Sequence, residues 1–183
     1  MQTLIEEEHA SDLVREIYDK IKTGLQIDFV PNFFKALAVR PDILHLNWEM
    51  MNTIFLRGVL PRTLKELIYI TLSKANGCEY CTTAHLAFCK IMGLGEHIIH
   101  ALLHNIEDLQ PIRTREIIKI VLRLGKLPVV INPDDLAKLE QLGITPKELQ
   151  ELISVISLIN YHNSTIDILQ IPVDAEFLEV VRG

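Results

Sequence analysis

Residues 66–94 read ELIYITLSKANGCEYCTTAHLAFCKIMGL, and this stretch decides the fold. On both sides of Asn76-Gly77 the apolar residues recur at helical spacing. The Asn-Gly pair is a strong stop signal, because glycine readily adopts the left-handed backbone that ends helices. Pro61, upstream, suits the first position of the first helix. The stretch therefore predicts two helices joined by a tight turn that folds the second back along the first.

Helical periodicity extends outward from this hairpin in both directions, with proline and glycine between the segments. Ser11 is a suitable cap for a helix with Leu13, Ile17 and Ile21 on one face. Thr145 caps the longest predicted helix, whose apolar residues cover much of its circumference, as expected of a central or intersubunit helix. The other predicted segments follow Pro31, run from Pro41 to Gly58, and cover residues 96–105, 111–125 and 133–143.

A strand is conceivable only at LPVVI, residues 127–131, and a single strand has no partner to pair with. We therefore predict an all-α fold. The chain has 183 residues, which suits one domain with a full hydrophobic core, so we expect a single helical domain over residues 1–183.

Composition limits the partners of the protein. Hydrophobic residues make up 49% of the chain and the mean hydropathy is +0.23. A small monomer would struggle to bury so much apolar helix surface, so we expect a homo-oligomer. The formal net charge of −6 argues against nucleic acid or an anionic membrane as a partner, since both require a basic surface.

Two further features predict a cytoplasmic protein in a reducing compartment. The opening sequence MQTLIEEEHASD has no basic region followed by an apolar one, and apolar stretches such as residues 152–160 are much shorter than the roughly 20 residues of a bilayer span. The three cysteines are Cys78, Cys81 and Cys89. An odd, tightly clustered set is not a disulfide framework and indicates redox catalysis or metal binding.

Cys78 and Cys81 form a CxxC pair at the predicted start of a helix, where free N–H groups and the helix dipole stabilise a thiolate. His85 lies one turn after Cys81 on the same face, and helical side chains lean toward the amino terminus, so its imidazole is directed at Cys81. Cys78 is separated from His85 by a rise of roughly 10.5 Å, too far for a direct hydrogen bond. The spacing predicts Cys81 as the attacking thiol and Cys78 as the resolving thiol.

Glu66 is the third element of the predicted site. It lies on the helix before the turn, so the turn at Asn76-Gly77 allows it to approach His85. A carboxylate there would fix the imidazole tautomer and hold its proton, as in a nucleophile–base–acid relay. Residues 61–93 thus form the predicted redox core.

Zinc is the main alternative, since Cys78, Cys81, His85 and Cys89 form a Cys/His series. On one continuous helix its outer members are separated by roughly 16 Å of rise, whereas ligand bonds to zinc are about 2.0–2.3 Å long. Zinc would require the helix to begin after Cys81, or a second chain. Covalent haem would need histidine where Thr82 stands. We therefore predict no metal and no cofactor, and interpret Cys89 as a buried free cysteine.

Two other polar clusters have ordinary explanations. The repeat of His97, His100 and His104 is better interpreted as the polar face of a short helix than as a metal site. The Tyr161–Asn163 tripeptide interrupts the apolar pattern of the longest helix. It would either line a pocket or form a polar patch at a subunit contact.

The hairpin resembles the core of the alkylhydroperoxidase D-like branch of the carboxymuconolactone decarboxylase superfamily. The family pattern is a glutamate, a twelve-residue step to CxxC, and a histidine four residues past the second cysteine. Glu66, Cys78, Cys81 and His85 occupy these positions. The hairpin is more similar to the peroxidase-related subgroup, whose motif has tyrosine between the cysteines, as this chain has Tyr80.

The resemblance implies an all-helical fold assembled into trimers or hexamers. It implies an antioxidant enzyme in which Cys81 acts on a hydroperoxide through the Glu66–His85 relay and Cys78 closes the disulfide. A dithiol or thioredoxin-like protein would be the reductant. Family members also serve as dithiol adaptors, so an adaptor or disulfide reductase without peroxidase activity is the alternative. Lactone decarboxylation is disfavoured, because the decarboxylating members lack the cysteine pair.

One departure from the family concerns the residue before the second cysteine. The best-studied branch has histidine at this position, where this chain has Tyr80. Any contribution of that imidazole to peroxide reduction is therefore missing here.

Overall fold

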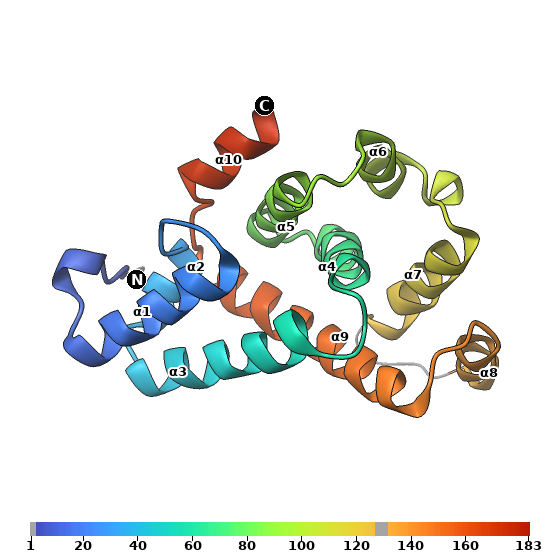
Figure 1. The fold of residues 1–183 in the computed structure, drawn as a ribbon, viewed down its shortest axis with the longest axis horizontal. Coiled ribbons are helices and arrows are strands. Elements are labelled where there is room, and N and C mark those ends of the chain that lie inside the picture. The colour runs from blue at the N-terminus through green and yellow to red at the C-terminus, as the bar shows by residue number, and fades with distance from the viewer. Residues whose placement is uncertain (1–2, 127–131) are drawn as a thin grey trace.

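The computed structural model describes residues 3–126 and 132–183, and all regular structure in that part of the chain is helical (Figure 1). The predicted all-α class is therefore confirmed, whereas residues 127–131, the one conceivable strand, lie outside the described residues. The α-helices are α1 (Asp12–Leu25), α2 (Asn32–Leu37), α3 (Pro41–Met50), α4 (Arg62–Asn76), α5 (Glu79–Ile91), α6 (Glu96–His104), α7 (Ile112–Leu124), α8 (Pro133–Gln141), α9 (Pro146–Leu169) and α10 (Ala175–Arg182). Three shorter helices are η1 (Glu7–His9), the π-helical η2 (Met51–Arg57) and η3 (Ile106–Asp108).

The hairpin of α4 and α5 lies at the centre of the molecule (Figure 1). Gly77 ends α4 with a φ of 80°, a left-handed conformation that favours glycine, and Cys78 is the amino-terminal cap of α5. Helix α4 packs against α5, α7 and α9, and α10 covers α5. Every side chain of α4 from Leu64 to Ser73 is buried. The site residues on this hairpin are therefore held between helices on several sides.

A buried ion pair joins α4 to α9. The Lys65 ammonium is 1% exposed and lies 2.7 Å from a carboxylate oxygen of Glu151, and it also donates to the carbonyl of Ile54. The second oxygen of Glu151 accepts the backbone N–H groups of Val59 and Leu60 just before α4. Buried charges are costly unless paired and hydrogen-bonded, and here both conditions are met.

Most predicted helix ends agree with the structure. Ser11 accepts a hydrogen bond from the backbone of α1, and Thr145 forms a reciprocal capping box at the start of α9. Pro61 is the cap before α4 and not its first residue, because its ψ of 134° is extended. No helix in residues 3–126 and 132–183 is both long and apolar enough to cross a bilayer.

Leu13 does not share the buried face of Ile17 and Ile21, because its side chain is 57% exposed. The buried stripe of α1 starts one residue later, at Val14, and continues through Ile17 and Ile21. A shift of one residue turns a helical side chain by about 100°, which carries Leu13 to the solvent side. Helix α10 lies outside the predicted segments.

Candidate functional site

Glu66 and His85 meet across the α4–α5 hairpin, as predicted. A carboxylate oxygen of Glu66 lies 2.5 Å from Nδ1 of His85. Glu66 is fully buried and His85 is 7% exposed. With Nδ1–H donated to Glu66, the lone pair of Nε2 is available as a base on the other side of the ring.

Arg62, which the sequence analysis did not select, holds the other oxygen of the same carboxylate. Its Nε donates to Oε1 of Glu66 at 2.7 Å, and its guanidinium lies over the ring of Phe55. Burial by itself raises the pKa of Glu66, but the charges of His85 and Arg62 outweigh burial and hold that pKa below its ordinary value. The four-residue step from Arg62 to Glu66 is the usual spacing of a helical ion pair and could have identified this residue.

Tyr69, one turn beyond Glu66 on α4, stacks on the imidazole of His85. The two ring centroids are 3.5 Å apart and the planes differ by 19°. Phe55 contacts both rings edge-on. These aromatic contacts restrict the imidazole to one plane, so Glu66 fixes its tautomer while Tyr69 fixes its orientation.

The two cysteines of the CxxC pair are thiols with different environments. Cys78 is completely buried, whereas Cys81 is 3% exposed. A hydrogen bond from Cys81 lowers the pKa of Cys78. The same hydrogen bond, together with burial, raises the pKa of Cys81 well above its ordinary value. The hydrogen bond between the two thiols thus favours the charged form of Cys78 and the neutral form of Cys81.

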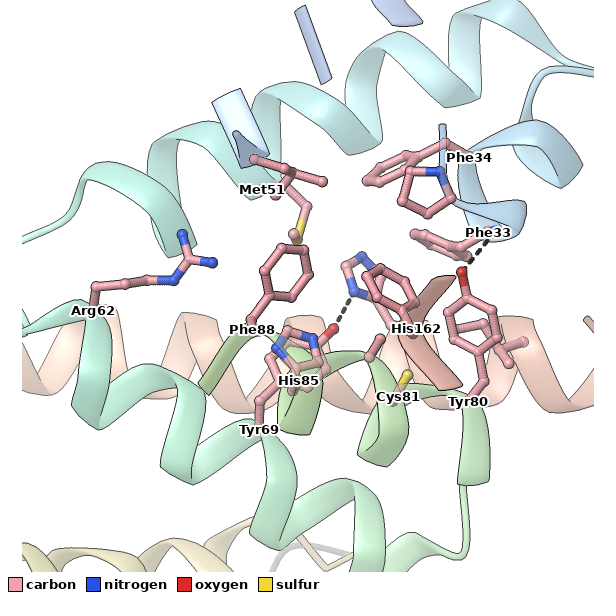
Figure 2. Close-up of a pocket in the computed structure, with 15 residues that line it drawn as sticks. Phe33, Phe34, Met51, Arg62, Tyr69, Tyr80, Cys81, His85, Phe88 and His162 are labelled. Carbon is pink, nitrogen blue, oxygen red and sulfur yellow. Dashed lines mark hydrogen bonds between the residues drawn. The ribbon is translucent and has the colours of Figure 1, made fainter. Parts of the chain in front are cut away.

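A pocket opens between the hairpin and the surrounding helices (Figure 2). Its cavity volume, counted as the space open to the centre of a water-sized sphere, is about 40 Å³. Cys81 and His85 of α5 line one wall together with Arg62 and Tyr69 of α4. The other walls are mostly apolar and aromatic, with side chains from Phe33, Phe34, Met51, Phe88, Ile166 and Phe177. Cys78 is not among the lining residues.

Tyr80 has a structural position at the edge of this pocket. Its hydroxyl donates to Asp174 at 2.7 Å and accepts the backbone N–H of Phe33. The other oxygen of Asp174 accepts the backbone N–H of Asn32, so Tyr80 ties α5 to the start of α2 and to the cap of α10. The residue that differs from the best-studied branch thus anchors neighbouring helices.

His162 is the member of the Tyr161–Asn163 tripeptide that lines the pocket. It is 3% exposed, and burial lowers its pKa to about 3, so the ring is neutral. Its two ring nitrogens contact Tyr69 and Asn47. Tyr161 is 41% exposed, and Asn163 bonds to Ser73 and Asn76 outside the pocket. Of the three residues in this tripeptide, only His162 lines the pocket.

The remaining candidates lie outside the pocket. Cys89 is completely buried, and burial raises its pKa to about 12, which agrees with its interpretation as a packed free thiol. His97, His100 and His104 are exposed on α6. Within residues 3–126 and 132–183, no group of three or more His, Cys, Asp or Glu side chains is arranged to hold a metal ion.

Comparison with protein families agrees with the motif. Residues 41–110 match the model of the carboxymuconolactone decarboxylase family. These residues form a carboxymuconolactone decarboxylase family domain. The predicted family is confirmed, and its domain includes Glu66, the CxxC pair and His85. A search of curated protein sequences gives no significant match.

Several solved structures share the complete fold of this chain. One is an alkylhydroperoxidase AhpD core, a peroxidase-related protein from Ralstonia eutropha JMP134, with a TM-score of 0.85 and 24% identity over 97% of this chain and 94% of that one. A peroxidase-related protein from Silicibacter sp. TM1040 has a TM-score of 0.81 and 21% identity over 91% and 87% of the two chains. The debrominase Bmp8 has a TM-score of 0.84 and 15% identity over 100% and 96%. At these identities the likeness establishes the alkylhydroperoxidase D-like fold.

Proposed function

We propose that this protein is a dithiol peroxidase that reduces hydroperoxides through Cys81, with Cys78 as the resolving thiol. One observation carries the proposal: Cys81 lines the same pocket as His85, and His85 is held by the buried carboxylate of Glu66. A nucleophile, a base and an orienting acid are therefore gathered at a cavity that a small molecule can enter.

In the first step, Nε2 of His85 takes the proton of the Cys81 thiol, and Glu66 stabilises the imidazolium. The Cys81 sulfur attacks the distal oxygen of the peroxide, so an S–O bond forms and the O–O bond breaks. The leaving oxygen takes the proton from His85 and departs as an alcohol or water. The product on the enzyme is the Cys81 sulfenic acid.

In the second step, Cys78 attacks the sulfenic sulfur, forms the Cys78–Cys81 disulfide and releases water. The lowered pKa of Cys78 favours this role, because the thiolate is the attacking species in disulfide formation. Peroxide access to the two sulfurs supports the same assignment of roles, since Cys78 is completely buried and does not line the pocket. A dithiol or thioredoxin-like reductant then restores both thiols.

The alternative is a redox adaptor that exchanges disulfides with a partner protein. Burial of both cysteines argues against it, because Cys81 is only 3% exposed and a protein disulfide would have to reach its sulfur. A hydroperoxide needs only the space of the pocket. The observed geometry therefore favours a small oxidant over a protein as the first substrate.

The proposal also includes a homo-oligomer of three or six chains. Several large apolar side chains are exposed on different helices, including Leu46 at 63%, Ile153 at 52% and Ile168 at 79%. Exposed apolar surface of this kind is typical of subunit contacts. Sedimentation equilibrium should therefore give a mass of three or six chains, and a monomer at all concentrations would contradict the expectation.

The experiment that tests the peroxidase function uses the reduced protein alone. Cumene hydroperoxide or hydrogen peroxide is added without any reductant, and peroxide loss and free thiols are measured together. We expect one peroxide consumed for each two thiols lost, with a disulfide between Cys78 and Cys81. Oxidation that requires a protein disulfide, with no direct peroxide consumption, would support the adaptor.

A further inference from the structure

Helix α10 packs against α5 beside the pocket (Figure 1). One residue of α10, Phe177, lines the pocket, and its side chain is 2% exposed. Ala175, Glu176 and Glu179 of the same helix are exposed. A single helix therefore separates this part of the pocket from solvent, and the ring of Phe177 forms its inner surface.

Two other aromatic rings hold the Phe177 ring in place. It lies edge-on to Phe88 with 5.4 Å between the centroids, and edge-on to Phe29 with 5.1 Å between the centroids. Phe88 also lines the pocket, and its centroid is 6.1 Å from that of the His85 imidazole. One aromatic ring therefore lies between Phe177 and the proposed base.

Hydrogen bonds fix both ends of α10. At its start, the carboxylate of Asp174, which is 3% exposed, accepts the hydroxyl of Tyr80 at 2.7 Å. Near its end, the Lys90 ammonium donates to the carbonyl of Val181 at 2.9 Å. Tyr80 and Lys90 both belong to α5, so α10 is fixed to the helix that carries the proposed attacking thiol.

The space inside the pocket is small. Its volume of about 40 Å³ holds a few water molecules, since each needs about 10–15 Å³ counted in the same way. Hydrogen peroxide is little larger than a water molecule and fits this space. Cumene hydroperoxide carries a phenyl ring and a branched alkyl group in addition, and does not fit unless a wall residue moves or is made smaller.

We propose that Phe177 is a specificity-determining residue, whose ring limits the pocket to hydrogen peroxide and keeps bulky hydroperoxides away from Cys81. Tyr80 and Asp174 are its positioning residues, because they fix the start of the helix that carries it. The inference rests on the proposed peroxidase function and deepens it by stating which peroxides reach the thiol. A packed ring can discriminate in this way because a larger substrate would have to displace it.

The first test compares Phe177→Ala with Val180→Ala. Both changes remove apolar atoms from α10, but Val180 does not line the pocket. In Phe177→Ala we expect kcat/KM for cumene hydroperoxide to rise by about tenfold, and kcat/KM for hydrogen peroxide to stay within about twofold of the wild type. Val180→Ala should keep the wild-type ratio of the two values. An unchanged ratio in folded Phe177→Ala, or the same increase in Val180→Ala, would overturn the proposal.

The second test measures binding without catalysis, with 2-phenyl-2-propanol, the alcohol that cumene hydroperoxide yields. Calorimetry should detect saturable binding in Phe177→Ala and none in the wild type or in Val180→Ala, since an apolar cavity opened by truncation takes up an aromatic ligand. Equal binding in all three proteins, or none in any of them, would overturn the proposal. Should Phe177→Ala fail to fold, Phe177→Leu replaces it in both tests, with smaller changes in the same direction.

The binding test also separates the two proposals. If Phe177→Ala alone binds the alcohol and no protein consumes peroxide, the peroxidase function fails while the size limit set by Phe177 stands. If the wild type consumes both peroxides and Phe177→Ala changes neither the ratio nor the binding, the size limit fails while the peroxidase function stands.

The third test addresses the positioning residues. Tyr80→Phe removes only the hydroxyl that Asp174 accepts, and Tyr161→Phe makes the same change at a residue outside the pocket. Loss of this hydrogen bond should let α10 move away from α5, so the kcat/KM for cumene hydroperoxide relative to that for hydrogen peroxide should rise about threefold in Tyr80→Phe and stay unchanged in Tyr161→Phe. The ratio is the readout because a general effect on the neighbouring Cys81 changes both values alike. An unchanged ratio in Tyr80→Phe would contradict the positioning role.

Discussion

The two sides of the pocket differ in both chemistry and origin. The wall from α4 and α5 carries the ionisable groups, with Glu66, His85 and Cys81 inside one helical hairpin. The facing wall comes from α2, η2 and α9 and carries aromatic and apolar groups, with the neutral His162 as its titratable member. The cluster of ionisable groups is thus local in sequence, and the wall that faces it comes from distant segments.

This division has a physical reason. A relay needs atoms placed within tenths of an ångström, and two helices joined by a tight turn provide that precision. The facing wall excludes water, which strengthens each charge interaction on the first wall. Neutral His162 adds polarity without adding a charge that would oppose protonation of His85. Substitutions on the first wall should therefore change reaction rates, and a substitution at His162 on the facing wall should change the pH dependence of stability.

The largest effect is expected at the cysteines of the first wall. Cys81→Ser should abolish peroxide consumption, because the attacking sulfur is gone. Cys78→Ser should allow a single turnover that stops at a Cys81 sulfenic acid, trapped with dimedone and located by mass spectrometry. A peroxide-dependent sulfenic acid on Cys78 in Cys81→Ser would instead assign attack to the thiol with the lowered pKa.

The next effect concerns the relay itself. His85→Ala should lower the rate of sulfenic acid formation by about 10²–10⁴-fold, since it removes the general base. Glu66→Gln should lower the rate less, and the double variant should cost little more than His85→Ala because the two residues act as a unit. Stopped-flow measurements of the three variants provide the test, and fully additive losses would show that the residues act separately.

His162, on the facing wall, should make the free energy of unfolding depend on pH. The pKa of His162 is lowered to about 3, so below its ordinary value of 6.5 the unfolded chain binds a proton that the folded protein does not. Stability should therefore fall with decreasing pH between about 6.5 and about 3, by about 1.4 kcal/mol per pH unit from this group. Urea unfolding at several pH values should show a slope reduced by that amount in His162→Asn.

A control for this slope is one of the exposed histidines of α6, His97. His97→Asn removes a titratable histidine that lies at the surface. The dependence of its unfolding free energy on pH should match that of the wild type. An unchanged slope in His162→Asn would show that this imidazole is not held neutral by burial.

The smallest effect is expected at Cys89, on the same helix as Cys81 but outside the pocket. Cys89→Ala should leave peroxide consumption unchanged and lower the unfolding free energy by about 1 kcal/mol through lost packing. Peptide mapping after mild oxidation should find Cys89 reduced. A disulfide that includes Cys89 would contradict the separation between the reactive and the packed thiols of α5.

The sequence by itself determined most of the helices, the hairpin and the contact between Glu66 and His85. These features depend on steps of a few residues, and helix geometry converts such steps directly into distances. Gly77 could be identified as the turn for the same reason, because its positive φ is a local requirement. The CxxC pair at the start of α5 likewise follows from the order of residues in one segment.

Only the tertiary structure decided what faces this hairpin. The contact of Tyr69 with His162 joins residues 93 positions apart, Tyr80 reaches Asp174 across 94 positions, and Asn47 reaches His162 across 115. Helical periodicity identifies a buried face but not its partner, since any apolar face can pack against another. The difference in pocket access between Cys81 and Cys78 has the same origin. The two thiols are neighbours in one motif, and the packing of α2, α9 and α10 opens the pocket to Cys81 alone.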